Sequence, residues 1–502
     1  MSEMRWTWRL ALLLTLTSPQ VGFAAEQWLR INSSNFELFT TAGEKKGREA
    51  ILYFEQVRSL FAKLNKSGHA PAFPVRIIAF RTDKEYTPYR INDFAAAYYM
   101  GGHDRDYIVM KSIDPELYPV AIHEYVHLIV KHSGLPLPVW LNEGFADLYS
   151  TMKPFGKQVI VGIPYVGRMR ELQVSKWLTL DALLAVDHGS PLYNEKQKAG
   201  VFYAESWALT HMLYLSSDYW KRFPDFLAAI KPGSSQASVF QQVYGKSLAQ
   251  VRTDLERYMR GDRFNGQYVD VTLEKSAESP EIRPASPLES GLALADLLAG
   301  TRKREEAKAA YESLARANPK DPEIELAMAY LAWMGSDHEE VKRHFARAIE
   351  LGTTNAKVHF DYAMMLQGQE GKDPEIMALL RKAVELKPDL VEAHYMLGFY
   401  ASNAGRFGEA VVHLREVKKL EKDQALPYFR TLAFAFYKLG QPEEAKKNAE
   451  SALKFATEPK DIERAKEFLA FLTQAPSKQA APPTDRNPDG RPRLVRRDPQ
   501  EQ

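Results

Sequence analysis

The sequence of 502 residues contains no cysteine. This absence excludes disulfide bonds and thiolate zinc sites, so any metal ligands must be histidine, aspartate or glutamate. Net charge is also nearly absent, because 66 basic residues stand against 64 acidic ones. A balance this even gives no reason to expect a nucleic-acid partner or attraction to an anionic membrane. The apolar fraction of 45% is ample for globular cores, and the length suggests two or three domains.

Long apolar runs are missing as well. Arg5 and Arg9 precede a short apolar run over residues 10–16, and small residues follow up to Ala24. This pattern is typical of a secretory signal peptide, which we expect over residues 1–24. The run is too short to span a bilayer, and no later stretch is long enough, so we expect no membrane span after cleavage. We therefore expect an exported protein, periplasmic if the source is a Gram-negative bacterium and otherwise secreted. An uncleaved anchor is the alternative.

Residues 26–270 mix strand-like and helical patterns. Residues 28–41 and 74–81 are rich in β-formers and predict strands, whereas residues 44–64 carry apolar side chains at helical spacing. From residue 179 onward the pattern is mostly helical. We therefore predict an α+β domain in which a small sheet leads into a helical core.

Residues 271–287 contain three prolines and no apolar period, which predicts a linker. Beyond it, small or apolar residues recur at steps of 34 or 35 residues. One column is Ala307, Val341, Ile376, Ala410 and Ala445, and a second is Leu314, Ala348, Ala383, Val417 and Ala452. A period near 34 is the tetratricopeptide signature and argues against an irregular helical bundle. We predict five tetratricopeptide repeats and a capping helix over residues 288–474, an all-α solenoid, and a disordered tail over residues 475–502.

The most informative stretch is His123-Glu124-Tyr125-Val126-His127, an H-E-x-x-H pattern. Residues four apart on a helix lie on one face, so two imidazoles there can bind one metal ion. Pro119 and Gly134 suit the start and the end of such a helix, which we predict over residues 119–132. Glu124 lies beside the histidines and can take a proton from water. A catalytic zinc site needs a third protein ligand from elsewhere in the chain.

Glu143 is the candidate for that third ligand. Fifteen residues separate it from His127, and it lies in Trp140-Leu141-Asn142-Glu143-Gly144-Phe145-Ala146-Asp147, which continues as a predicted helix through Met152. The short turn over residues 133–138 is expected to set the two helices side by side. A glutamate on the second helix can then reach back to a metal on the first.

The pair H-E-Y-V-H and W-L-N-E-G-F-A-D resembles the gluzincin metallopeptidases, the clan that includes thermolysin and the zinc aminopeptidases. The resemblance implies a zincin-like metallopeptidase domain with one zinc ion held by His123, His127 and Glu143. It implies that Glu124 is the general base. It also implies that Asp147, four residues after Glu143 as in the clan's E-x-x-x-D pattern, hydrogen-bonds a ligand histidine.

The tetrahedral oxyanion of such a reaction needs a further donor. Tyr203 is the first candidate, because aminopeptidase-like relatives place a tyrosine at a similar distance after the ligand glutamate. His211, eight residues later on the same predicted helix face, is the second. An ordinary place in the core is the alternative for both. The G-x-M-E-N segment that reads a free substrate N-terminus in aminopeptidases is absent, so we expect an endopeptidase.

Two functions are compatible with these patterns. The first is an exported zinc-dependent peptidase that cleaves a polypeptide substrate, with repeats whose groove recruits a protein partner or that substrate. The second is a non-catalytic tetratricopeptide scaffold or adaptor that retains a metal-binding, peptidase-like domain. A zinc amidase acting on cell-wall peptides would share the site and stays open.

Overall fold

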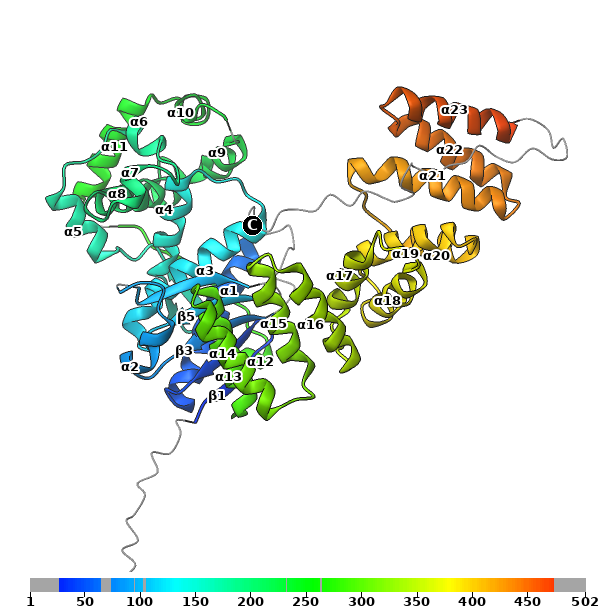
Figure 1. Cartoon of the computed structure of the whole chain (residues 1–502). Coiled ribbons are helices and arrows are strands. Elements are labelled where there is room, and N and C mark those ends of the chain that lie inside the picture. The colour runs from blue at the N-terminus through cyan, green and yellow to red at the C-terminus, as the bar shows by residue number, and fades with distance from the viewer. Residues whose placement is uncertain are drawn as a thin grey trace, which may run out of the picture. The chain divides into compact units, whose positions relative to one another are not determined.

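The computed structural model of the chain describes residues 27–64, 74–93, 95–102, 105–231, 233–261 and 264–473. The chain divides into two compact units, Met1–Ala307 and Lys308–Gln502 (Figure 1). The predicted signal peptide and the predicted tail lie outside the described residues. Within the described ranges, no helix is both long and apolar enough to cross a membrane.

A six-stranded sheet in the order β4-β5-β3-β2-β1-β9 organises the first unit. The pairs β2–β3 and β3–β5 are parallel, and the other three pairs are antiparallel. The strands are β1 (Leu29–Asn32), β2 (Phe36–Thr40), β3 (Val75–Ala79), β4 (Ala97–Gly101), β5 (Asp106–Met110) and β9 (Glu281–Pro284). The α+β class predicted for this part of the chain is confirmed.

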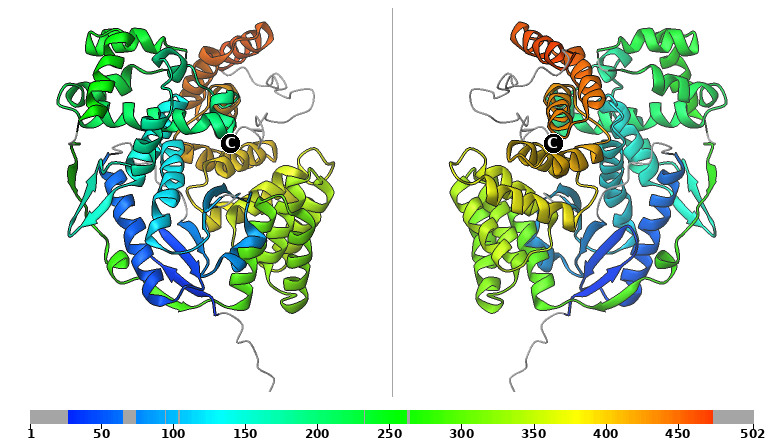
Figure 2. Two further views of the ribbon diagram at one scale, coloured as in Figure 1. Left: turned by 90° about the vertical axis from the view of Figure 1, so that its left-hand side faces the viewer. Right: turned by 90° about the vertical axis from the view of Figure 1, so that its right-hand side faces the viewer.

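Helices cover both faces of this sheet. Because successive strand residues point to opposite faces, Ile77 and Ile78 enter different cores. Ile77 packs with α1 (Glu44–Leu64) and α3 (Tyr118–Ser133), and Figure 2 shows α1 alongside the strands. Ile78 packs with α13 (Pro287–Gly300). The sheet therefore gives α3, which carries the H-E-x-x-H pattern, a rigid support.

A second core of the first unit is helical and includes the buried Trp140, Phe202, Trp207 and Phe226. Its helices are α4 (Val139–Ser150), α5 (Val166–Val174), α6 (Leu180–Leu184), α7 (Pro191–Asn194), α8 (Lys196–Leu215), α9 (Phe223–Ala229), α10 (Gln236–Tyr244) and α11 (Leu248–Arg260). A three-stranded sheet of β6 (Lys153–Phe155), β7 (Gln158–Val161) and β8 (Gln267–Asp270) contributes Val159 and Val161 to the same core as Ile77. The remaining short helices are α2 (Asp83–Tyr86) and α12 (Lys275–Glu278).

The predicted strand over residues 28–41 is in fact two strands, β1 and β2. They form a hairpin in which the backbone N–H of Ser33 donates to the carbonyl of Phe36 at 2.9 Å. The Ser33 hydroxyl accepts from the backbone N–H of Phe36 at 3.2 Å. The polar run Asn32-Ser33-Ser34-Asn35 favours such a turn, and this signal outweighs the β-formers on either side.

Residues 271–287 differ from the predicted linker. They contain β9, which pairs antiparallel with β1 and sets Ile282 opposite Ile31. The prolines that suggested a linker are compatible with this edge strand, because Pro284 is its last residue. The pairing joins segments about 250 residues apart in sequence, so no local pattern could reveal it.

The first helix of the predicted repeats, α13, also belongs to the first unit. Its Ala293 and Leu297 pack with Phe39 and Ile78 of the sheet. The hydroxyl of Tyr107 donates to Asp296 at 2.8 Å. The division between the units falls at residues 307 and 308, inside α14 (Arg304–Ala317), rather than at the predicted linker.

The second unit consists of helix pairs and a final single helix. The pairs are α15 (Pro322–Met334) with α16 (His338–Glu350), α17 (Ala356–Leu366) with α18 (Asp373–Leu386), α19 (Val391–Asn403) with α20 (Phe407–Glu416), and α21 (Lys422–Lys438) with α22 (Pro442–Phe455). The last helix is α23 (Pro459–Thr473). The first predicted column, from Ala307 to Ala445, is fully buried at all five positions. The predicted tetratricopeptide-type solenoid is confirmed.

The backbone repeats with the same period as the side chains. Residues with positive φ occur in the turn inside each helix pair, starting with the turn between α13 and α14: Arg302, Ser336, Gly371, Gly405 and Gly440. Their steps of 34, 35, 34 and 35 residues match those of the two predicted columns. A left-handed residue is a common way to end a helix, and glycine adopts it at least cost. Four of these turns are three residues long, whereas the turn between α17 and α18 has six residues and a second left-handed glycine, Gly368.

Candidate metal centre

Helix α3 begins with Pro119 near its start and ends at Gly134, whose φ of 66° is the left-handed cap expected there. His123 and His127 lie one turn apart on this helix. Their Nε2 atoms are 3.1 Å apart, and the two rings meet edge to face. The two predicted ligands therefore share one face of the helix, with both Nε2 atoms turned to the same point.

Glu143 on α4 completes the cluster. Its Oε2 atom lies 3.2 Å from His123 Nε2 and 3.4 Å from His127 Nε2. The glutamate is buried, whereas the two histidines are partly exposed. These are the three predicted metal ligands. No other group of three His, Asp or Glu residues with converging ligand atoms occurs among the residues that the structure describes.

Gly144 explains how α4 is held in place. A Cβ atom at this position would lie 2.0 Å from Thr210 Oγ1 and 2.4 Å from the carbonyl oxygen of Ser206, both on α8. Only glycine allows this approach of α4 and α8. Packing thus fixes the residue next to Glu143, the predicted ligand, and α8 lies close enough to bring Tyr203 to the cluster.

Both histidines are oriented through their Nδ1 atoms. His123 Nδ1 donates to Asp147 Oδ1 at 2.9 Å, as predicted, and His127 Nδ1 donates to Asn142 Oδ1 at 3.2 Å. A proton on each Nδ1 leaves the lone pair of each Nε2 free for a metal. The role of Asn142 was not predicted, although the residue precedes Glu143 directly in the recognised pattern.

Arg168 on α5 extends the network. Its Nε donates to Asp147 Oδ2 at 2.6 Å, and its Nη2 lies 3.3 Å from Oδ1. The guanidinium also lies over the ring of Tyr203, at 4.9 Å from the ring centre. Asp147 thus links His123, a predicted ligand, to Arg168. Arg168 was not predicted, because nothing in the sequence relates α5 to the cluster.

The distances within the cluster fit a zinc ion. Tetrahedral zinc with ligands at about 2.0–2.1 Å separates its ligand atoms by about 3.3 Å. The observed separations are 3.1, 3.2 and 3.4 Å. Glu143 Oε2 is buried and lacks a hydrogen-bond partner of good geometry, an arrangement that is costly unless a cation faces the atom. Two nitrogens and one oxygen are a donor set that zinc commonly takes.

Electrostatics also favours positive charge between these residues. Burial raises the pKa of Glu143, but the close approach of His123 and His127 outweighs burial and holds the pKa well below its usual range. Burial lowers the pKa of His123, but Asp147 and Glu143 outweigh it and raise the pKa to about 10. The carboxylate therefore stays ionised, and the histidine side of the cluster attracts either a proton or a metal ion. Metal binding would release that proton.

Tyr203 on α8 lies at the cluster, with its ring 6.5 Å from that of His123. Burial raises its pKa well above the usual range, and the charge of Glu143 adds to the effect. The phenol is therefore a proton donor at neutral pH. Glu124 is partly buried on α3, and its charge is among those that raise the pKa of Tyr193, after burial and Glu143.

The structure corrects the second oxyanion candidate, His211. This residue is fully buried in the helical core, and both of its ring nitrogens are engaged. Nε2 donates to the carbonyl of Gly162 at 3.0 Å, so Nδ1 accepts from the hydroxyl of Tyr258 at 2.7 Å. Eight residues of helix also carry it about 12 Å along the axis from Tyr203. His211 is a structural residue because it has no free proton to donate.

Tyr193 on α7 is a further site residue that the sequence did not indicate. Its hydroxyl donates to Glu143 Oε1 at 3.0 Å. It lies fifty residues after Glu143 in a helix of four residues, outside every motif. Only the fold brings the two together.

No family model and no curated protein matches the chain. Solved repeat structures that resemble it include YrrB, a TPR protein with an unusual peptide-binding site, which is 19% identical over 35% of this chain and 90% of that one, with a TM-score of 0.29. MamA is 16% identical over 38% of this chain and 98% of that one, with a TM-score of 0.26. PilW, a type IV pilus biogenesis factor, is 20% identical over 38% of this chain and 87% of that one, with a TM-score of 0.25. The repeat fold of the second unit rests on its own helix pairs rather than on these similarities.

Proposed function

We propose that the first unit is a zinc-dependent endopeptidase of the gluzincin type and that the repeats bind a protein partner or the substrate. One observation carries the proposal. His123 Nε2, His127 Nε2 and Glu143 Oε2 converge with mutual distances of 3.1 to 3.4 Å, and their other polar atoms are held by separate partners. Export of the protein, predicted from residues 1–24, is part of the proposal.

The chemistry divides among the residues of the site. A bound zinc ion would supply a Lewis acid that polarises a scissile carbonyl and makes water more acidic. Glu124, between the two histidines on α3, is the proposed base that takes the water proton and delivers it to the leaving amine. Tyr203 is the proposed donor to the oxyanion. Asp147, which accepts a hydrogen bond from Arg168, orients His123 to bind the metal ion.

An extended polypeptide is the proposed substrate class. β4 is the last strand at one end of the six-stranded sheet, and it packs against α3. A substrate can add to such an edge through backbone hydrogen bonds, which are independent of its sequence. The absence of a G-x-M-E-N segment supports internal cleavage rather than removal of N-terminal residues.

The test compares the wild type with Glu124→Gln on an unfolded polypeptide such as reduced, alkylated casein. The loss of a general base should lower the rate of cleavage by about 100-fold to 10,000-fold. Because Glu124 is not a proposed ligand, both proteins should bind zinc equally. Equal cleavage by the two would exclude this mechanism, and a zinc-loaded wild type that cleaves nothing in a broad peptide library would refute the proposed activity.

The confirmed repeat fold favours a second candidate, a scaffold in which the peptidase-like unit binds metal without hydrolysis. Stacked helix pairs are a common means of binding polypeptides. A cellular phenotype that the Glu124→Gln variant restores would select this function if a chain lacking residues 318–473, which keeps α13 and α14, does not restore it. A phenotype that the truncated chain restores but Glu124→Gln does not would select the peptidase.

A further inference from the structure

We infer that Tyr193 is a positioning residue that fixes Glu143 as a metal ligand through a single oxygen. The inference rests on the proposed metal site and adds to it a residue from outside the recognised motifs. It follows from the different surroundings of the two oxygens of Glu143, from the support of the tyrosine ring, and from a hydrogen bond with one possible direction.

The two carboxylate oxygens of Glu143 have different surroundings. Oε1 accepts a hydrogen bond from the Tyr193 hydroxyl at 3.0 Å. Oε2 is buried, has no hydrogen-bond partner of good geometry, and faces the Nε2 atoms of His123 and His127. A carboxylate can hold a metal through one oxygen or both. With Oε1 occupied by a hydroxyl, only Oε2 is left for the ion.

The Tyr193 ring is held in place by neighbouring aromatic groups. Its ring centre lies 5.3 Å from that of His188, 6.0 Å from that of Phe202 and 6.1 Å from that of Tyr203. Its helix, α7, starts at Pro191, and the Ser190 hydroxyl just before it donates to Asp187 at 2.7 Å. The hydroxyl therefore reaches Glu143 from a supported ring, so little freedom is lost when the hydrogen bond forms.

The direction of the hydrogen bond is fixed. A carboxylate only accepts, so the Tyr193 hydroxyl must donate its proton to Glu143. Tyr203 lies beside Tyr193, with ring centres 6.1 Å apart, and is the residue proposed above to donate to a substrate oxygen. Tyr193 can therefore keep its hold on Glu143 while Tyr203 acts on the substrate.

This arrangement assigns different tasks to two neighbouring tyrosines. Loss of the Tyr193 hydroxyl frees Glu143 Oε1 and should weaken metal binding. Loss of the Tyr203 hydroxyl leaves the contact with Glu143 in place and should chiefly slow turnover. Partners that orient metal ligands typically contribute 10-fold to 100-fold in metal affinity, and this is the effect expected for Tyr193.

The experiment measures the zinc dissociation constant of the full-length chain by competition with a chelator, for the wild type, Tyr193→Phe, Tyr203→Phe and Tyr258→Phe. Tyr258 is a matched control because its hydroxyl bonds to His211 in the core. We expect a dissociation constant 10-fold to 100-fold higher for Tyr193→Phe and within about 3-fold of wild type for the other two. Cobalt substituted for zinc should show an altered visible absorption spectrum in Tyr193→Phe alone.

The outcomes separate the inference from the proposal beneath it. A wild type that binds neither zinc nor cobalt refutes the proposed metal site. A wild type that binds zinc, with a Tyr193→Phe variant of unchanged affinity and unchanged cobalt spectrum, refutes the role of Tyr193 and leaves the site intact. Equal weakening in Tyr258→Phe would also refute it, because the effect would then be general. The unfolding temperature of each metal-free variant shows whether the fold is kept.

Discussion

Each of the two units contains a pair of histidines whose ring nitrogens face each other at nearly the same distance. In the first unit, the Nε2 atoms of His123 and His127 are 3.1 Å apart. In the second, the Nδ1 atoms of His394 on α19 and His413 on α20 are 3.0 Å apart. The separation of two imidazoles alone therefore does not distinguish a metal site from a packing contact.

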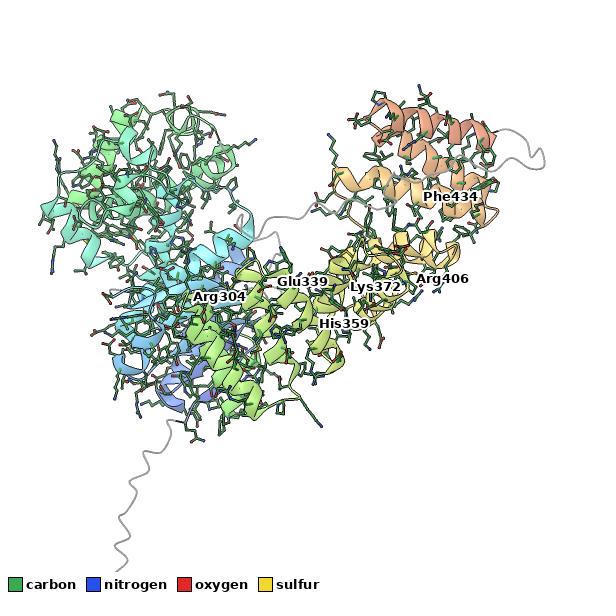
Figure 3. All side chains as sticks on the ribbon, in the orientation of Figure 1. Arg304, Glu339, His359, Lys372, Arg406 and Phe434 are labelled. Carbon is green, nitrogen blue, oxygen red and sulfur yellow. The ribbon has the colours of Figure 1, made fainter. Side chains whose placement is uncertain are left out.

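The surroundings make the difference. In the first pair, Asp147 and Asn142 take the outer nitrogens, and Glu143 adds a buried carboxylate oxygen. In the second, His394 Nε2 donates to the carbonyl of Pro388 at 3.0 Å, so its Nδ1 accepts the proton of His413. The second pair is satisfied by one shared proton. The His359 ring of α17 (Figure 3) is likewise bonded to a backbone carbonyl, that of Thr353.

The largest expected effect contrasts these two pairs directly. His123→Ala removes one of three protein ligands and should lower zinc affinity by at least about 100-fold, since a structural zinc ion gains roughly 3 kcal/mol per ligand. His394→Ala should leave the affinity unchanged. Chelator competition on both variants measures this contrast. A similar loss of zinc affinity in both variants would show that the surroundings of the two histidine pairs do not decide which pair binds zinc.

His211 sharpens the comparison with a third environment, that of a buried histidine bonded at both nitrogens. Burial lowers its pKa from 6.5 to about 4. Between pH 6.5 and pH 4, His211 binds a proton in the unfolded chain but not in the folded chain. The contribution of neutral His211 to the free energy of unfolding is therefore complete above pH 6.5 and is lost as pH falls toward 4. The free energy of unfolding should fall by roughly 3 kcal/mol. Denaturant unfolding across this pH range should show a flatter profile for His211→Phe than for the wild type. Identical profiles would contradict this assignment.

The smallest expected effect compares two glycines at close helix contacts. A Cβ atom at Gly144 would meet Thr210 Oγ1 at 2.0 Å, and one at Gly398 would meet Leu414 Cγ at 2.6 Å. Each alanine variant should lose about 1–3 kcal/mol of stability. Only Gly144→Ala should also weaken zinc binding, because Gly144 adjoins the ligand Glu143. Unfolding curves and zinc titrations of both variants test this, and unaltered zinc affinity in Gly144→Ala would contradict the role given to the contact.

Much of the candidate site could be predicted because its signals are local. The spacing of His123 and His127 requires only a helix, and α3 runs over Tyr118–Ser133 against a predicted 119–132. The short turn before α4 brings Glu143 back to the same face. The repeats could also be predicted from the sequence, because small or apolar residues recur with their period at buried positions such as Val341 and Ala410.

Apart from Asn142, the features that were missed depend on contacts between distant segments. β9 pairs with β1, which lies about 250 residues earlier in the sequence. The prolines in and around β9 indicated a linker instead. Tyr193 and Arg168 reach the cluster from short helices whose sequences carry no metal-site pattern. His211 shares a helix with Tyr203, and only the fold shows that a carbonyl and a tyrosine already occupy its nitrogens. Pairing and packing at long range decide these positions.

The most direct test of the account is an anomalous-scattering map of zinc-loaded crystals at the zinc absorption edge. The account predicts one strong peak per chain, about 2.0–2.1 Å from His123 Nε2, His127 Nε2 and Glu143 Oε2, and none at His394 and His413. An empty triad in zinc-loaded crystals, or a peak at the repeat histidines instead, would contradict it.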